Sequence, residues 1–93
     1  MTSPGTQRAP FAPPLLSLAS LRKGERARVV VVADADARLA TRMLELGFAP
    51  GESVRVVACA PGGFPIAVRV GASTFALREH EAKLVQVARE PAP

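Results

Sequence analysis

Cysteine and histidine, the side chains with the widest metal and nucleophile chemistry, occur once each in this chain, as Cys59 and His80. A structural zinc site has four ligands, so this pair would need carboxylates beside it. The acidic neighbours of His80 are Glu79 and Glu81, and three adjacent residues splay around a helical turn instead of converging. Ferrous iron would need several ligands that face one point. The sequence therefore predicts no metal site.

The remaining polar residues do not form a pattern that indicates catalysis. The segment 61–65 (PGGFP) lacks the lysine and the serine or threonine that hold phosphate and magnesium in nucleotide-binding loops. Asp34 and Asp36 come just before a helical pattern, where aspartate caps the first backbone N–H groups. No nucleophile with a neighbouring base is visible. We therefore expect no catalytic residue, no cofactor and no enzymatic activity.

The prolines of this 93-residue chain are concentrated at its two ends, with four of nine in the first 14 residues and two in the last three. Such segments bury too little apolar surface to offset the entropy of ordering. We expect disordered tails at residues 1–14 and 89–93. The remaining residues, 15–88, are enough for one small domain, because domains typically have roughly 50–250 residues.

Hydrophobic periodicity divides this domain into one helix and several short strands. Leu39, Met43 and Leu46 recur at helical spacing and Gly47 can end the helix, so a helix is expected at 37–46. Valine-rich or alternating apolar runs predict the strands, the first of them buried on much of both faces. The expected strands are 26–33, 53–60, 66–70, 74–77 and 84–87, with single helical turns at 15–21 and 78–83.

A small, partly open barrel is the simplest fold for these elements. Five strands in about 60 residues are too few for a sandwich of two large sheets, and a barrel limits exposed strand edges. We therefore predict a mainly β, SH3-like five-stranded barrel with one short α-helix after the first strand and a helical turn before the last. Cys59 is expected in a strand as a small buried residue.

The net charge of +4 comes from ten arginines and two lysines against eight acidic residues. This excess suits nucleic acid or an anionic membrane surface, but the basic residues are spread along the chain and mixed with acidic ones. The longest apolar run, residues 29–33, is far below the roughly 18 residues that span a membrane. We expect a cytoplasmic protein with no membrane insertion and no specific nucleic acid partner.

Several short motifs follow one another through the chain. Residues 18–24 have the form Leu-x-x-Leu-x-x-Gly, and residues 42–51 read RMLELGFAPG. Residues 60–66 (APGGFPI) match Ala-Pro-x-Gly-Asp-Pro-Ile, with Phe64 in place of the aspartate, and residues 71–82 end in ALREHEA. The same motifs occur in the same order in the FeoA family, and the chain resembles this family over residues 15–87. FeoA proteins are small cytosolic proteins of bacterial ferrous iron uptake.

The resemblance implies an SH3-like barrel with a helix after the first strand. It further implies a non-enzymatic accessory or regulatory protein that acts on the cytosolic part of the FeoB iron transporter, whose N-terminal portion binds GTP. Two alternatives stay open. One is a nucleic-acid-binding SH3-like domain of the ribosomal or elongation-factor type, which residues 23–25 (KGE) resemble. The other is a stand-alone relative of the SH3-like domain of metal-dependent repressors.

Apolar residues that the barrel core does not use predict a partner-binding groove between the end of the helix and the 61–65 loop. Three of the expected site residues are apolar side chains on the helix or in loops. Two are prolines that stiffen the loop, which reduces the entropy lost on binding. Two are arginines that would supply charge at the rim. The seven residues are Arg42, Leu44, Phe48, Pro61, Phe64, Pro65 and Arg69.

Overall fold

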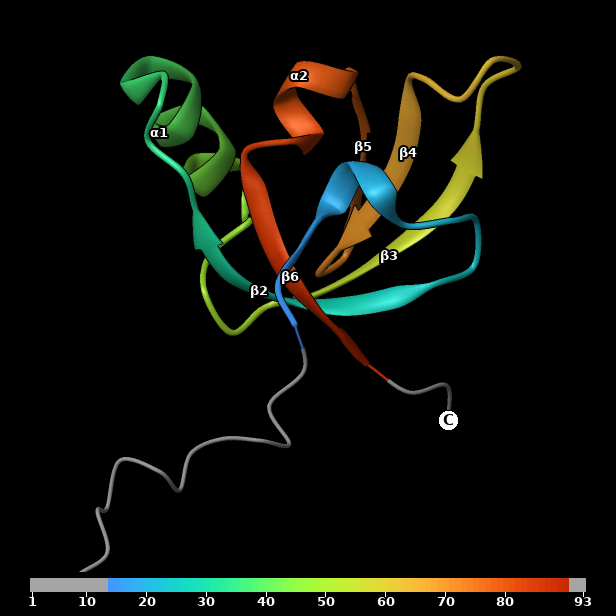
Figure 1. Cartoon of the computed structure of the whole chain (residues 1–93), viewed down its shortest axis with the longest axis horizontal. Coiled ribbons are helices and arrows are strands. Elements are labelled where there is room, and N and C mark those ends of the chain that lie inside the picture. The colour runs from blue at the N-terminus through green and yellow to red at the C-terminus, as the bar shows by residue number, and fades with distance from the viewer. Residues whose placement is uncertain (1–13, 91–93) are drawn as a thin grey trace, which may run out of the picture.

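Six antiparallel strands form a single bent sheet in the computed structural model, which describes residues 14–90 (Figure 1). The strand order across the sheet is β1-β6-β2-β3-β4-β5. In chain order the elements are β1 (Leu16–Ser17), the 3₁₀ turn η2 (Leu18–Ser20), β2 (Arg26–Val32), α1 (Ala37–Leu46), β3 (Ser53–Cys59), β4 (Ile66–Val70), β5 (Ser73–Leu77), α2 (Glu79–Ala82) and β6 (Val85–Glu90). Figure 1 shows both helices and the β3–β4 loop at one end of the sheet.

The mainly β architecture, the helix after the first long strand and the helical turn before the last strand are confirmed. The count of five strands is wrong, because residues 16–17 pair with β6 and add the short strand β1. The last strand is also longer than expected. Arg89 and Glu90 pair with β2, so these two residues belong to the sheet and not to a tail. Pro14, the last residue of the predicted N-terminal tail, is exposed and lies outside any helix or strand. The rest of both predicted tails, residues 1–13 and 91–93, lies outside the described residues.

Two β-bulges interrupt the regular alternation of the sheet. One lies between Val29 and Val31 in β2 and the other between Val56 and Ala58 in β3. A bulge places an extra residue in one strand and bends it, which changes the faces on which the following residues lie. Val30 and Val31 are therefore 41% and 44% exposed. The expectation that this strand is buried on much of both faces is wrong.

The bulge in β3 precedes Ala58 and Cys59, the last two residues of the strand. Ala58 and Cys59 are both exposed, although Val56 just before them is fully buried. The prediction of a buried cysteine is therefore wrong. Strict alternation from Val56 would have placed Ala58 inside, and the bulge shifts that register by one residue. The same shift places Cys59 opposite the buried Ile66, so the bulge accounts for the exposure of Ala58 and not for that of Cys59, the last residue of β3.

The core consists almost entirely of aliphatic side chains. Each of the six strands, or a turn beside it, contributes to this core. Phe48 is its largest fully buried side chain, and Met43 of α1, five residues earlier, is also fully buried. The Phe48 ring packs against the half-buried ring of Phe75, with centroids 6.1 Å apart and planes tilted by 55°. Aromatic pairs favour such tilted geometry. Phe48 therefore links the end of α1 to the sheet.

Helix α1 begins and ends where the sequence predicts, because its signals are local. The Asp36 carboxylate accepts a hydrogen bond from the Leu39 N–H at 3.1 Å and caps the helix. At the other end Gly47 takes φ of 115°, and its N–H donates to the Leu44 carbonyl at 3.0 Å. This left-handed conformation suits glycine at the end of a helix. It turns the chain so that Phe48 enters the core.

Gly47→Val is expected to lower the free energy of unfolding by roughly 1 kcal/mol or more, because a β-branched residue resists positive φ. The cost comes from the backbone conformation, because a Cβ at this position would be in ordinary van der Waals contact with Val70, 3.8 Å from both of its methyl groups. Thermal melts monitored by circular dichroism measure the change. The matched control is Thr41→Val, on the exposed face of the same helix. If Gly47→Val melts like the parent, the role of Gly47 in ending the helix is wrong.

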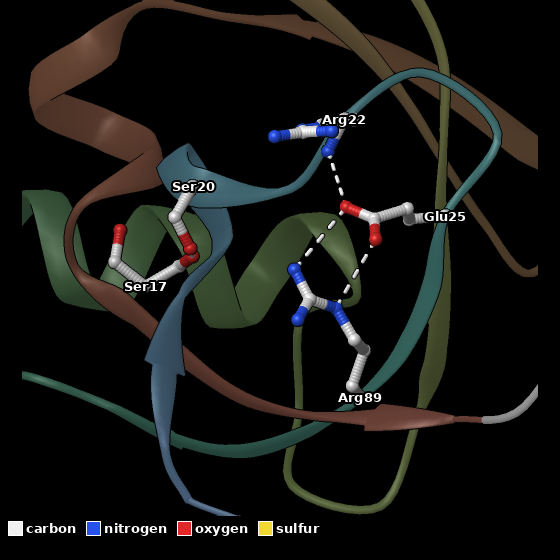
Figure 2. Close-up of polar contacts among 5 residues, drawn as sticks. All are labelled: Ser17, Ser20, Arg22, Glu25 and Arg89. Carbon is white, nitrogen blue, oxygen red and sulfur yellow. Dashed lines mark hydrogen bonds and ion pairs between the residues drawn. The ribbon is translucent and has the colours of Figure 1, made fainter.

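Glu25 connects the turn before β2 to the end of β6 (Figure 2). Its Oε1 accepts a hydrogen bond from the backbone N–H of Arg22 at 2.6 Å. The Arg89 guanidinium reaches both carboxylate oxygens, with Nε 3.2 Å from Oε2 and Nη2 3.4 Å from Oε1. The backbone hydrogen bond from Arg22 is the largest cause, and it lowers the pKa of Glu25 below its ordinary value of 4.5. Desolvation, the second cause, opposes this shift, and the charge of Arg89 adds a smaller lowering effect.

This lowered pKa predicts the direction of a pH effect on stability. Ionised Glu25 stabilises the folded chain above pH 4.5, and that contribution is lost as the pH falls through the lower folded-state pKa. Below pH 4.5 the melting temperature of the parent should therefore fall more steeply with acidification than that of Glu25→Gln. Melts over a series of acidic buffers test this. Parallel curves for the two proteins would show that Glu25 contributes nothing.

Candidate partner-binding site

A hollow of about 360 Å³ is lined by residues of α1, the β3–β4 loop, β5 and the start of α2. Figure 1 shows both helices at this end of the molecule. The lining residues of the hollow come from four separate segments of the chain. They are Arg42, Pro65, Ala76, Arg78 and Glu81, and we call this site the α1–α2 hollow. Four elements can meet here because the bent sheet brings its β5 edge close to both helices.

Three of the lining residues face outward for local reasons. Arg42 is exposed on α1 and precedes the fully buried Met43. On β5, alternation directs Leu77 into the core and leaves Ala76 on the outer face. The small side chain of Ala76 leaves space above the sheet. Pro65 is exposed at the end of the β3–β4 loop, directly before β4.

The charges of the α1–α2 hollow are unbalanced. Within residues 14–90, neither Arg42 nor Arg78 forms an ion pair shorter than 4.0 Å. The carboxylate of Glu81 accepts a hydrogen bond from the backbone N–H of Arg78 at 2.7 Å, which holds it at the start of α2. Two guanidinium groups therefore remain available beside one carboxylate that is already engaged. Such a site suits a segment that presents carboxylate or carbonyl oxygens.

Two of the seven predicted site residues, Arg42 and Pro65, line this hollow. Leu44 is 44% exposed, but residues two apart on a helix point in different directions, so Leu44 faces away from Arg42. Pro61 is exposed in the β3–β4 loop outside the lining, and the half-buried Phe64 packs against the core. The proposed contribution of these three residues to binding therefore requires a partner that extends beyond the hollow.

Two predicted site residues lie elsewhere. Phe48 is fully buried and has no surface to offer a partner, so its place in the predicted groove is a mistake. The physical reason is that this small core has few aromatic residues and uses Phe48 to fill its centre. Arg69 lies on the outer face of β4 and lines a second hollow with Arg26 and Arg55. It is therefore not at the rim shared with Arg42.

The sequence analysis missed Ala76, Arg78 and Glu81 as lining residues. The sequence did contain a signal for Ala76. Phe75 and Leu77 are the apolar pair of this strand, and alternation leaves Ala76 on the opposite face. All three missed residues also lie in the motif at residues 75–82. Their proximity to Arg42 depends on the bend of the sheet, which no local pattern indicates.

Within the described part of the chain, no helix is long and apolar enough to cross a membrane. Among the same residues, no group of three or more histidine, cysteine, aspartate or glutamate side chains could hold a metal ion.

We expect calorimetric titration with Fe²⁺ or Zn²⁺ to give at most weak, non-stoichiometric binding. The reason is chemical, because Glu79 and Lys83 form an ion pair at 3.3 Å and Glu81 bonds the backbone at the start of α2. The neighbours of His80 therefore do not converge on a shared ion. His80→Ala is the matched variant. A stoichiometric site with sub-micromolar affinity that His80→Ala removes would contradict this prediction.

A bent antiparallel sheet around one aliphatic core, with a helix inserted after its first long strand, defines a small SH3-like domain. The model of the FeoA domain matches residues 16–89. The chain therefore belongs to the FeoA family, whose members are small accessory proteins associated with ferrous iron transport.

Solved structures of FeoA proteins agree with this assignment. The FeoA of Stenotrophomonas maltophilia, crystallised with zinc, is 44% identical, with a TM-score of 0.73 over 81% of this chain and 95% of that chain. The FeoA protein of Chlorobium tepidum is 32% identical, with a TM-score of 0.70 over 80% of this chain and 70% of that chain. These matches confirm the SH3-like fold predicted from the sequence.

A manganese-dependent transcriptional repressor has the same fold at lower similarity. It is 23% identical, with a TM-score of 0.77 over 94% of this chain and 48% of that chain. At this identity the match shows a shared fold. Among curated protein sequences, none matches the chain.

Proposed function

We propose that this chain is a cytoplasmic, non-enzymatic accessory protein of ferrous iron uptake that binds the cytosolic part of a FeoB-type transporter. The observation that carries the proposal is the match to the FeoA domain over residues 16–89. The α1–α2 hollow supplies a contact site of suitable chemistry, with two available guanidinium groups.

The surroundings of the hollow are stiff, which favours binding. Helix α1 is capped at both ends by Asp36 and Gly47. Pro65 limits the motion of the loop beside it, and the Pro65 carbonyl accepts a hydrogen bond from the Ala60 N–H at 3.0 Å. A surface that is already ordered loses little entropy when a partner docks. The proposed role is therefore a docking surface that contributes no reacting group.

Binding of the full chain to the purified cytosolic part of the transporter tests the proposed function. Isothermal titration calorimetry at physiological ionic strength should show saturable binding with one chain per transporter domain. A small basic domain of another fold serves as the control for non-specific attraction and should give no saturable signal. Absence of saturable binding by the full chain would contradict the proposal.

A further inference from the structure

Three arginines stand side by side on neighbouring strands, away from the α1–α2 hollow. Arg26 of β2 is directly opposite Arg55 of β3, and Arg55 is directly opposite Arg69 of β4. We call these three residues the arginine row. Directly opposite residues in an antiparallel sheet point to the same face. The neighbours Ala27, Val54 and Val70 are buried, so the arginine row lies on the outer face.

The arginine row is not neutralised by an ion pair in the part of the chain that the structure describes. Within residues 14–90, none of its three guanidinium groups forms an ion pair shorter than 4.0 Å. Glu90 is directly opposite Arg26 across β6 and β2, but its carboxylate is engaged elsewhere. It lies 2.7 Å from Arg28 Nη2 and accepts a hydrogen bond from the Ser53 hydroxyl at 2.9 Å. The positive charge of the row is therefore available to a ligand.

This arrangement opposes folding, because like charges directly opposite each other in a sheet are destabilising. Arg55 is repelled from both sides, because it is directly opposite Arg26 on one neighbouring strand and Arg69 on the other. A feature that conflicts with the stability of its own fold is commonly part of a functional site. An anionic ligand would neutralise the row and remove the repulsion.

We propose that the arginine row binds an acidic α-helical segment of a protein partner. Neighbouring strands are about 4.8 Å apart, which sets the spacing of the three arginine positions. Successive Cβ atoms of residues at i, i+4 and i+7 on one face of a helix are about 5–6 Å apart. Alternate residues of an extended chain are about 6.8 Å apart and match the row less well. Guanidinium groups also bind carboxylates through paired hydrogen bonds.

The chemistry around the row favours discrete carboxylates over a nucleic acid. The hollow beside the row is lined by its three arginines and by Glu52, Ser53, Val54 and Gly71. No aromatic residue is in this lining, so it offers no platform on which bases could stack. The carboxylate of Glu52 would repel a continuous phosphate backbone, whereas separate carboxylates can be placed to avoid it. This surface is distinct from the α1–α2 hollow, and its ligand does not depend on the proposed function.

The test uses the full chain and a labelled alanine-based peptide that carries glutamates at i, i+4 and i+7 on one helical face. Fluorescence anisotropy compares the parent with the triple variant Arg26→Gln, Arg55→Gln, Arg69→Gln. Since each exposed charge pair contributes modestly, the triple variant should bind about tenfold more weakly.

The matched control triple removes the same number of charges from exposed positions outside the row. It carries Arg22→Gln, Lys23→Gln and Arg38→Gln, and its affinity should stay within about twofold of the parent. A peptide of identical composition with alternating glutamates should bind more weakly than the helical peptide. The proposal is overturned if both triples lose affinity equally, if the parent does not bind, or if the alternating peptide binds as tightly. Tighter row-dependent binding of single-stranded DNA or of anionic lipid vesicles would also overturn it.

A second measurement tests the repulsion without any ligand. Arg55→Gln should melt about 2–4 °C above the parent at low ionic strength, because it removes two like-charge pairs. The difference should shrink in concentrated salt, which screens exposed charges. Equal melting temperatures at low ionic strength would show that the row carries no electrostatic cost, and the inference would lose its basis.

Discussion

Phe48→Ala is expected to lower the free energy of unfolding by roughly 3–5 kcal/mol, the usual cost of removing a fully buried aromatic ring. Phe48 is the largest fully buried side chain, and its ring packs against Phe75. Small domains have total stabilities of only about 5–15 kcal/mol. The variant should therefore lose a large share of its total stability.

Urea unfolding followed by circular dichroism measures this effect. Phe64→Ala is the matched control, because it removes the same side chain from a half-buried position in the β3–β4 loop. Its cost should be clearly smaller. Equal losses in the two variants would contradict the assignment of Phe48 to the centre of the core.

Charge reversal in the α1–α2 hollow is expected to have the largest effect on function. The double variant Arg42→Glu, Arg78→Glu should bind the cytosolic part of the transporter at least about tenfold more weakly, because both guanidinium groups become carboxylates. Both side chains are exposed and form no ion pair within residues 14–90, so the fold should be retained. Unchanged melting temperature shows that the loss is not caused by unfolding.

The matched control reverses the same number of charges outside the hollow, at Arg22 and Arg38. This control separates the chemistry of the hollow from attraction by the net charge of the chain. We expect it to retain most of the affinity at physiological ionic strength, where exposed charges are screened. If both double variants lose affinity to the same extent, the partner does not dock in the α1–α2 hollow.

The parts of the fold that depend on local signals could be predicted from the sequence. Asp36 and Gly47 determine both ends of α1, and the alternation Ile66, Val68, Val70 defines β4. Strand β1 could not be predicted in this way, because only its pairing with β6 makes it a strand. The extension of β6 through Glu90 could not be predicted either, because it also depends on pairing with another strand. Its final residues are held by pairing with β2 and by ion pairs formed across the sheet.

The candidate site was less predictable than the fold. The sequence analysis named Arg42 and Pro65, and both line the same hollow. Phe48 was misplaced because sequence alone does not show whether an aromatic residue after a helix enters the core. Arg69 was assigned to the wrong surface because its neighbours, Arg26 and Arg55, are determined by strand register. Strand register depends on pairing over long distances in the sequence, which short motifs do not encode.

Chemical-shift mapping of the ¹⁵N-labelled full chain, titrated with the cytosolic part of the transporter, tests the central claim most directly. It reports at once whether the partner binds and where. The account predicts saturable shifts that cluster at Arg42, Ala76, Arg78 and Glu81, on three elements that meet only in the folded chain. Absence of saturable shifts, or shifts confined to surfaces away from this hollow, would contradict it.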